Sequence, residues 1–399
     1  MDTTTESLWS RTERLPERKR LEGDIAADVA VIGGGMAGVL TAYLLRERGV
    51  DAVVLEAEQP GSGQTKNTTA KITAQHGRIY ARLIQAFGRE AAAQYAYANQ
   101  SAIAQYRRIV EERNIDCMFE ERDAYLYSTE EADSLRQEAE AASALGIDAA
   151  FTTETALPFP VKGAVRFRGQ AQFHPLRFLR AVSAELPVFA HTAVRSVEGG
   201  LLTTDRGSVK ARSVVFTTHY PFVNRPGYYF LRMHQERSYV LALENAFDPA
   251  GMYLGVDMDG LSLRSAAGTL LLGGGNHRTG ENKAGGKYEM LRASAKRYWP
   301  ESRETAHWSA QDCMSLDGVP YIGRFSSETP DWYVATGFQK WGMSTSMVAA
   351  TLLCDQITGR ENPSAAVFSP QRFHLSPSAK KLAIDGWHAA KGLAKEVFA

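Results

Sequence analysis

The segment 28–56, DVAVIGGGMAGVLTAYLLRERGVDAVVLE, joins two β-branched runs through a glycine turn and an apolar helical stretch. Gly33, Gly35 and Gly38 fill the three glycine positions of the pattern G-x-G-x-x-G. The first such glycine permits a tight turn, the second lets backbone approach a pyrophosphate, and the third lets helix and strand pack closely. The segment therefore predicts a strand–turn–helix–strand unit that binds a dinucleotide at the N-terminus of its helix.

Glu56 ends the second predicted strand of this unit. A carboxylate at that place can accept hydrogen bonds from the hydroxyls of an adenosine ribose, and it disfavours a 2′-phosphate. These residues leave NAD and FAD both open. The position of the unit near the start of the chain, together with the loop after Glu56, favours FAD.

Composition excludes several classes of partner. Lysine plus arginine number 45, as do aspartate plus glutamate, so no net charge favours nucleic acid or an anionic membrane. The first 22 residues contain no apolar run of the kind found in secretory signals, and residues 29–45, the most apolar stretch, are interrupted by glycines. We therefore expect a cytoplasmic protein without a transmembrane segment.

The three cysteines, Cys117, Cys313 and Cys354, form no C-x-x-C pair and have no nearby histidines at metal-site spacing. No metal site is expected. A sparse, odd count fits a reducing compartment, where cysteines are mostly small buried side chains.

Periodicity along the chain indicates pieces of a nucleotide fold that alternate with pieces of a second domain. At 399 residues the chain can supply roughly two to three domains' worth of core. Helical spacing covers 79–113, 129–145, 289–298 and 344–358, and strand-like runs are found at 161–167, 188–197, 200–217, 237–243, 251–256, 261–264, 269–273 and 333–337. The predicted fold is α/β, with a Rossmann-like FAD-binding domain (1–80, 165–225 and 305–365) interleaved with an α+β substrate domain on an antiparallel sheet (81–164 and 226–304), followed by a tail (366–399).

Three motifs carry a resemblance to a known family. They are the N-terminal unit, residues 172–179 (QFHPLRFL), and the C-terminal runs 317–323 (DGVPYIG) and 333–343 (YVATGFQKWGM). Over 28–363 the chain resembles the flavin-dependent superfamily of D-amino acid oxidases, glycine oxidases and sarcosine oxidases. The resemblance implies that backbone around Gly337 and Trp341–Met343, at a helix start, faces the pyrimidine edge of the flavin. The unit and the resemblance together assign to FAD the residues Gly33, Gly35, Met36, Ala37, Gly38, Glu56, Thr65, Thr69, Ala70, Lys71, Val194, Thr218, Gly337, Lys340, Trp341, Gly342 and Met343.

The loop 61–71 with residues 72–77 (ITAQHG) looks like a bacterial subfamily that is often fused to a C-terminal Rieske iron–sulfur domain. Residues 364–399 contain no cysteine, so no Rieske cluster is expected in this sequence. Electrons would leave by another route.

On the substrate side the resemblance suggests five candidates. Arg264 would clamp a substrate carboxylate with its planar guanidinium, and a surface strand arginine is the alternative. Lys71 and Lys340 would stabilise reduced flavin or assist oxygen, although lysines are usually exposed. Tyr239 and His277 would lie near the flavin, with a turn histidine as the alternative for His277.

Four further positions bear on the cofactor. Sarcosine oxidases have a lysine shortly before the histidine that corresponds to His277, where this chain has Leu272 or Gly273, so rapid reaction with oxygen is not expected. Cys313 lies too close to Asp317 for the covalent flavin cysteine of those enzymes, which favours noncovalent FAD. His174 is expected to be structural, and His76 to be a loop residue beside the cofactor.

The sequence thus predicts an FAD-dependent oxidoreductase that oxidises a C–N bond of an amino acid or secondary amine, passing hydride to flavin N5 and releasing an imine that hydrolyses. Its partners would be the small-molecule substrate and an electron acceptor, either oxygen, a quinone or a redox protein. Two alternatives remain: an amine dehydrogenase that passes electrons to a quinone or protein carrier, and a noncatalytic, redox-sensing FAD module.

Overall fold

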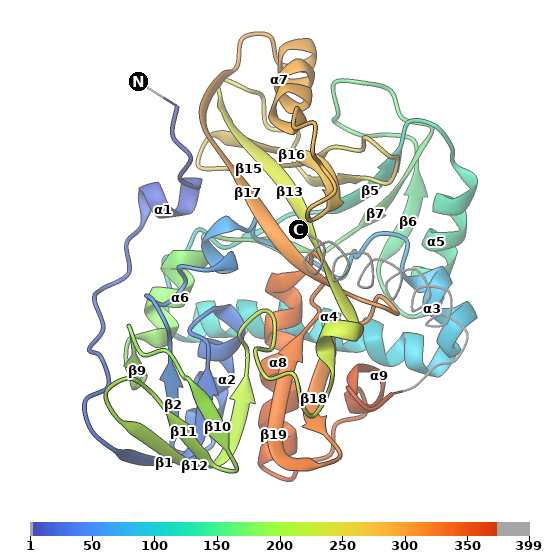
Figure 1. Cartoon of the computed structure of the whole chain (residues 1–399). Coiled ribbons are helices and arrows are strands. Elements are labelled where there is room, and N and C mark those ends of the chain that lie inside the picture. The colour runs from blue at the N-terminus through green and yellow to red at the C-terminus, as the bar shows by residue number, and fades with distance from the viewer. Residues whose placement is uncertain (1–2, 373–399) are drawn as a thin grey trace, which may run out of the picture.

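The computed structural model describes residues 3–372, which form two eight-stranded sheets and one three-stranded sheet. In Figure 1 the first large sheet lies at the bottom of the molecule and the second at the top. None of the helices in this described part has the length and apolar character needed to cross a bilayer. The predicted α/β fold class is confirmed by this arrangement.

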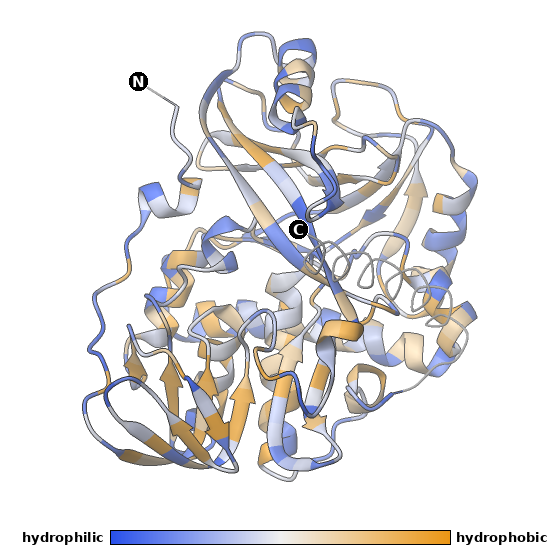
Figure 2. Cartoon of the chain, in the orientation of Figure 1, coloured by the Kyte–Doolittle hydropathy of each residue, from blue (hydrophilic) through white to orange (hydrophobic). Residues whose placement is uncertain are grey.

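The first sheet is the predicted nucleotide fold. Its parallel strands lie in the order β9 (Val188–Phe189), β2 (Ala52–Leu55), β1 (Ile25–Ile32), β12 (Ser208–Phe216) and β19 (Thr329–Thr336). The short run Ala52–Leu55 is entirely buried, as expected for a parallel strand that is covered on both faces, and Figure 2 shows these strands mostly in hydrophobic orange. Their carboxyl ends share one edge. Antiparallel additions are β10 (Ser196–Glu198), β11 (Leu201–Thr203) and β18 (Tyr321–Ser326).

The second sheet is mainly antiparallel. Its order is β17 (Arg303–Ser315), β13 (Met233–Glu244), β16 (Thr269–Arg278), β15 (Ser262–Ala266), β14 (Met252–Gly255), β5 (Ala124–Ser128), β7 (Gly163–Phe167) and β6 (Ala149–Thr152). The ladder between β13 and β17 runs from Met233 opposite Ser315 to Glu244 opposite Arg303. These two strands rise from the lower sheet to the top of the molecule (Figure 1). Because β17 pairs along its length in this sheet, it lies outside the first sheet even though the expected FAD-binding segment begins at residue 305.

Helices fill the space around the sheets. α2 (Met36–Glu47) is buried on almost all sides and packs against α8 (Gly342–Ile357), as expected for a helix without a polar face. The remaining elements are α1 (Leu8–Thr12), η1 (Gln64–Asn67), β3 (Lys71–Ile72), α3 (Tyr80–Phe87), α4 (Arg89–Glu112), β4 (Glu120–Glu121), α5 (Asp133–Ala144), β8 (Ala171–Gln172), α6 (Pro175–Ser183), η2 (Tyr229–Leu231), α7 (Lys287–Tyr298) and α9 (Ala365–Phe368).

Three local expectations differ from the structure. The helical stretch 79–113 is two helices, because Gly88 has φ 85° and ends α3 before α4 begins. The expected strand 188–197 is mostly loop between β9 and β10. The polar start of the chain contains α1, whose Trp9 is buried. Of the predicted tail, residues 373–399 lie outside the described part.

A buried ion pair fixes the end of the described chain. Arg372 donates through Nε to Asp317 Oδ2 and through Nη2 to Asp317 Oδ1, both at 2.9 Å, and both side chains are almost fully buried. The neighbouring positive charge of Arg372 helps to hold the pKa of Asp317 below its usual range, against the opposing effect of burial. The motif 317–323 therefore holds the segment after α9 against β18.

We predict that Asp317→Asn lowers the free energy of unfolding by about 3–5 kcal/mol, because it leaves a buried guanidinium without its counter-charge. Chemical denaturation of the holoprotein measures the loss. Asp331→Asn, at an exposed strand position, is the matched control and should change stability little. Equal stability of the Asp317 variant and the control would contradict the assigned role of the pair.

Candidate functional site

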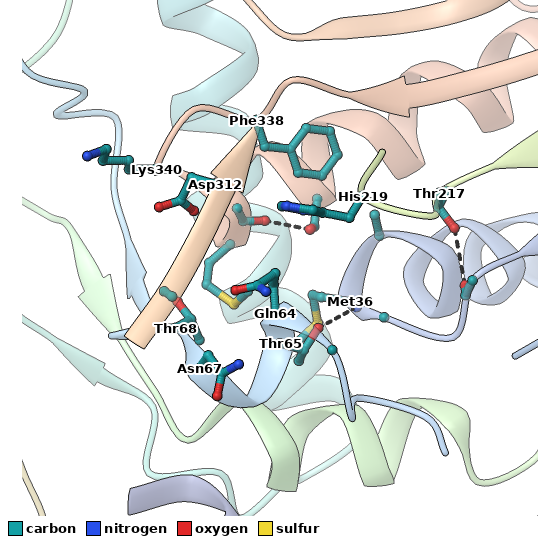
Figure 3. A pocket seen from close by; sticks show the side chains of 18 of the residues that line it. Met36, Gln64, Thr65, Asn67, Thr68, Thr217, His219, Asp312, Phe338 and Lys340 are labelled. Atoms are coloured by element: carbon teal, nitrogen blue, oxygen red, sulfur yellow. Dashed lines mark hydrogen bonds between the residues drawn. The ribbon is translucent and has the colours of Figure 1, made fainter. Parts of the chain in front are cut away.

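A cavity of about 550 Å³ lies between the carboxyl edge of the first sheet and the face of the second sheet. It begins at the turn after β1 and passes η1. It ends between the start of α8 and strands β13, β15 and β16. Figure 3 shows side chains from these segments around it. Predicted residues that line it are Gly33, Gly35, Met36, Ala37, Glu56, Thr65, Thr69, Lys71, Val194, Thr218, Tyr239, Gly337, Lys340, Trp341, Gly342 and Met343.

The glycine turn forms the first end of this cavity. Gly33 has φ 108°, and a Cβ added there would lie 2.8 Å from the carbonyl oxygen of Thr217. A Cβ on Gly38 would lie 2.0 Å from Gly33 O, so this glycine brings α2 against β1 and does not itself line the cavity. Gly35 does line it, and its added Cβ would meet only Thr65 Oγ1, at 3.4 Å. The first and third glycines thus shape the turn, whereas the second leaves space inside the cavity.

Glu56 is held beside this turn by backbone donors. Its Oε2 accepts a hydrogen bond from Gly34 N–H at 2.6 Å, and its Oε1 accepts one from Glu58 N–H at 2.8 Å. The carboxylate therefore has a fixed direction at the cavity wall. An acceptor held in this way can bind a pair of hydroxyl groups without losing rotamer freedom on binding.

The loop after β2 closes over the start of α2. Thr65 Oγ1 accepts from Met36 N–H at 3.0 Å, one of the free donors at the helix N-terminus (Figure 3). Two carbonyl groups of the same loop are held from outside: Trp308 Nε1 donates to Asn67 O at 3.0 Å, and Trp9 Nε1 donates to Thr68 O at 2.6 Å. Contacts from α2, from β17 of the second sheet and from α1 therefore position this loop.

The other end of the cavity is the start of α8. Gly337 has φ 68°, a left-handed conformation that favours glycine. A Cβ added at Gly342 would have no neighbour within 4 Å, so the first turn of α8 opens onto free space. Its N–H groups and the positive end of the helix dipole favour an anionic or electron-rich group there.

His76 packs against this end of the cavity from the side that faces away from the cavity. Its ring stacks on Trp341 with centroids 4.7 Å apart and a 15° tilt. Nε2 lies 2.7 Å from Thr73 O and therefore carries the hydrogen, while Nδ1, at 2.6 Å, accepts from the Tyr95 hydroxyl. Burial lowers the pKa of His76 to about 3, so it stays neutral. His76 was expected beside the cofactor; it does not line the cavity itself and contacts it only through Trp341.

Lys71 supplies a titratable group on the wall toward the second sheet. Nζ donates to Tyr253 O at 2.8 Å and to Ser262 Oγ at 2.7 Å. Burial, together with the charge of Arg264, lowers its pKa to about 7. Tyr239 and Asn276, on the neighbouring strands β13 and β16, also line the cavity. Lys71 is thus placed to change between a cation and a neutral amine near neutral pH.

Asp312 lines the cavity but is not among the site residues predicted from the sequence. Burial and the nearby charge of Glu236 raise its pKa to about 7, against the opposing effect of Lys340. Lys340 Nζ lies 2.9 Å from Glu236 Oε2, so its charge is already paired. Side chains alternate between the two faces of β17: Ala310 and Asp312 line the cavity, whereas Gln311 and Cys313 do not. This period of two is the signal that could have identified Asp312. His219, whose Nε2 is buried without a hydrogen-bond partner, also lines it and was not assigned.

Four predicted site residues do not line the cavity. Besides Gly38, these are Ala70, buried under the loop, His277, whose ring stacks beside Tyr239, and Arg264. Arg264 points away from the cavity, because its Nη1 donates to Thr69 O at 2.8 Å and Ala70 O at 2.7 Å. The structure therefore does not support Arg264 as a clamp for a substrate carboxylate. His174 is structural as expected: it caps α6 by accepting from Arg177 N–H.

The cysteines lie away from the cofactor cavity. Cys117, Cys313 and Cys354 are free and buried. Cys313 does not line the cavity, and burial raises the pKa of its thiol to about 12. Within residues 3–372 no cluster of three metal-ligating side chains is found. Noncovalent attachment of a cofactor remains a prediction, and it is supported by the position of the Cys313 side chain outside the cavity.

Comparison with known families decides the class of this cavity. The family model of FAD dependent oxidoreductases, DAO, matches residues 28–356. The chain belongs to this family. It is an FAD-dependent oxidoreductase, which confirms the predicted cofactor and the predicted enzyme class.

Individual relatives are similar to this chain over most of its length. A curated relative from Bacillus subtilis (strain 168), named putative Rieske 2Fe-2S iron-sulfur protein YhfW, is 38% identical over 98% of this chain and 80% of its own length. Two similar solved structures are glycine oxidase from Geobacillus kaustophilus (20% identity, 87% of this chain and 99% of that one, TM-score 0.72) and L-proline dehydrogenase from P. horikoshii (17%, 88% and 98%, TM-score 0.73). At these identities the solved structures show a shared fold.

The residues present fit FAD. The cavity has one helix N-terminus at each end, at α2 and at α8, as a group with a pyrophosphate and an electron-accepting ring requires. Gly35 and Gly342 leave space where a side chain would intrude. The buried, unpartnered Nε2 of the partly exposed His219 adds a polar atom that faces the same region (Figure 3).

We predict that Gly35→Val and Gly38→Ala fail for different reasons. Gly35→Val should fold but purify without flavin, because its branched side chain occupies cavity space and meets little protein. Gly38→Ala should lower the free energy of unfolding by about 1–3 kcal/mol, as overpacking does, because its Cβ overlaps Gly33 O. Visible absorbance measures flavin content, and chemical denaturation is compared with flavin-free wild type. Normal flavin content in Gly35→Val would exclude the turn from the cofactor site.

Proposed function

We propose that this oxidoreductase removes hydride from the carbon of a C–N bond in an amino acid or secondary amine, giving an imine that water hydrolyses. FAD, when bound, accepts that hydride at N5. The proposal is supported by the relatives, whose names include glycine oxidase and L-proline dehydrogenase. The observation that carries it is that the cavity continues past the dinucleotide unit to a wall formed by Lys71, Tyr239 and Asn276.

In this proposal FAD is held at both ends of the cavity, by the start of α2 and by the start of α8. Glu56 would accept from the adenosine ribose, the α2 N-terminus would hold the pyrophosphate, and the backbone from Gly337 to Met343 would hold the flavin. The start of α8 would stabilise negative charge on the reduced ring. Lys340 contributes less free charge than expected, because Glu236 already pairs with it.

Lys71 takes the role of substrate anchor that Arg264 does not fill. Two of its three donor directions go to Tyr253 O and Ser262 Oγ. In its protonated form the remaining one can bind a substrate carboxylate at the cavity wall. Because its pKa lies at about 7, the anchor is charged below that pH and is lost above it unless the bound carboxylate keeps the proton in place.

A second candidate function is an amine dehydrogenase that passes electrons to a quinone or a protein carrier. The relative from Bacillus subtilis that is named as a Rieske iron–sulfur protein favours it, because such a cluster carries single electrons. The absence of a lysine at Leu272 and Gly273 also favours slow reaction with oxygen.

The experiment for both candidates uses the purified yellow protein and a panel of amino acids and secondary amines. Anaerobic bleaching of the flavin by a member of the panel is the expected result. Reoxidation by air would assign an oxidase, whereas reoxidation only by a quinone or an artificial acceptor would assign a dehydrogenase. A flavin that no amine bleaches but that dithionite reduces would contradict amine oxidation and favour a noncatalytic module.

We predict that Lys71→Met raises the KM for the best amino-acid substrate at pH 6, on the order of tenfold or more, as expected for a lost charged hydrogen bond. The difference should shrink above pH 8, where Lys71 in the free enzyme is neutral. The amine that corresponds to the same substrate without its carboxylate is the control, and its KM should stay unchanged. Equal losses for acid and amine would remove Lys71 from carboxylate binding.

A further inference from the structure

A second cavity, of about 230 Å³, lies apart from the cofactor cavity and shares no lining residue with it. It is formed where α1 meets β4, β8 and the end of β15; α1 and α6 lie at the left of Figure 1. Its walls are largely apolar, with Trp9, Phe119 and Phe173 among them, and Met118 at its edge is 39% exposed. Nothing in the proposed reaction uses this cavity.

Arg264 is the unusual residue of this second cavity. Its side chain is buried, and Nη1 donates to the carbonyl oxygens of Thr69, Ala70 and Phe173. Nε is buried without a hydrogen-bond partner, and within residues 3–372 neither Nε nor Nη2 donates to a carboxylate. Burial of a guanidinium without a counter-charge is costly, and the Nε–Nη2 edge is the one that binds carboxylates in a bidentate manner.

The other charged or titratable groups of the second cavity are already engaged, whereas Oε1 of Gln172 is buried without a hydrogen-bond partner in the described part of the chain. Glu120 accepts from Arg122 Nε at 2.7 Å and from Gln172 Nε2 at 2.8 Å. His174 bonds through Nδ1 to Arg177 N–H and through Nε2 to Thr12 Oγ1, and burial lowers its pKa to about 4, so it adds no positive charge. Because Glu120 is paired with Arg122, Arg264 is the one cation among the described residues lining this cavity that has no bonded carboxylate, which suits a ligand with a single negative charge and disfavours a phosphate or a dicarboxylate.

The same arginine connects the two cavities. The carbonyl groups it binds belong to Thr69, which lines the cofactor cavity, and to Ala70, which has φ 56°. A left-handed alanine persists only where its surroundings hold it, and here Arg264 is part of what holds it. Lys71 follows directly and lines the cofactor cavity.

We propose that the second cavity binds a small organic monocarboxylate with an apolar body, whose carboxylate pairs with Nε and Nη2 of Arg264, and that this binding is transmitted through residues 69–71 to the cofactor cavity. The volume lies below the roughly 300–1,000 Å³ of sites for drug-sized ligands, which limits the ligand to a compact acid. The ring of Trp9, 5.2 Å from the Arg264 guanidinium carbon, supplies an apolar wall beside the charge.

A consequence for Lys71 follows from charge alone. The positive charge of Arg264 contributes to the lowered pKa of Lys71. A carboxylate on Arg264 offsets that charge, so the pKa of Lys71 rises and more of it is protonated at neutral pH. If Lys71 anchors the substrate as proposed above, the affinity for an amino-acid substrate then rises. This consequence rests on the proposed function, whereas binding to the second cavity does not.

The test uses the flavin-loaded full chain, phenylacetate as the probe and phenylacetamide as its uncharged match. Calorimetry should show one phenylacetate per chain and at least about tenfold weaker binding of the amide, because only the acid supplies the missing counter-charge. Met118→Glu places a carboxylate at the edge of the second cavity and should weaken phenylacetate binding by about tenfold. Its neutral match, Met118→Gln, should bind as the wild type does.

Asn276→Asp separates the two cavities, because Asn276 is exposed and lines only the cofactor cavity. Its phenylacetate affinity should equal that of the wild type. A tenfold loss in Asn276→Asp, with none in Met118→Glu, would show that the acid binds in the cofactor cavity and would overturn the proposal. Equal binding of acid and amide would overturn it as well.

Transmission has its own readout. Titration with phenylacetate should change the visible absorption of the bound flavin with the same midpoint as the calorimetric binding, in wild type and Met118→Gln alike. An unchanged flavin spectrum at full saturation would overturn transmission through residues 69–71. Since this readout needs no turnover, failure of the proposed amine oxidation would leave its result intact.

Discussion

The close approach of α2 to the turn after β1 is the contact on which the cofactor cavity depends. Gly38 leaves no room for a side chain against Gly33 O. The Thr217 hydroxyl lies 2.9 Å from Ile32 O and 3.1 Å from Gly33 O, and it ties the end of β12 to the same turn. This packing directs the helix N-terminus at the cavity, and Glu56, Thr65 and the loop after η1 are all placed relative to it.

The parts of the fold that sequence predicts are those in which one local pattern determines the outcome. The three glycines and Glu56 lie in a single βαβ unit, so their spacing specifies a turn whose geometry is nearly independent of the rest. The run around Gly337 to Met343 was found through its resemblance to the family, and it is also a local feature, with Gly337 at φ 68° just before the start of α8. The residues of both patterns other than Gly38 line the cavity.

Side-chain direction across the second sheet could not be predicted in the same way. Arg264 and Asp312 lie on strands whose face toward the cavity depends on register with distant partners, β16 for one and β13 for the other. A shift of one residue exchanges the two faces of a strand. Arg264 consequently turned toward Trp9, in a short helix that the polar start of the chain did not indicate. The tertiary fold alone joins these two residues.

The ladder of β13 and β17 also has mechanical consequences. It extends from Glu244 and Arg303 down to Met233 and Ser315, with a register shift between Ala242 and Leu243, and Met314 bridges to Phe338 beside the α8 start. Large domain closures require a few backbone positions that can absorb rotation, and a paired double strand offers few. Entry and exit of small molecules are therefore left to side chains at the rim, such as the half-exposed Phe222. We therefore expect rotation of rim side chains, and not closure of one sheet on the other, to control access to the cofactor cavity.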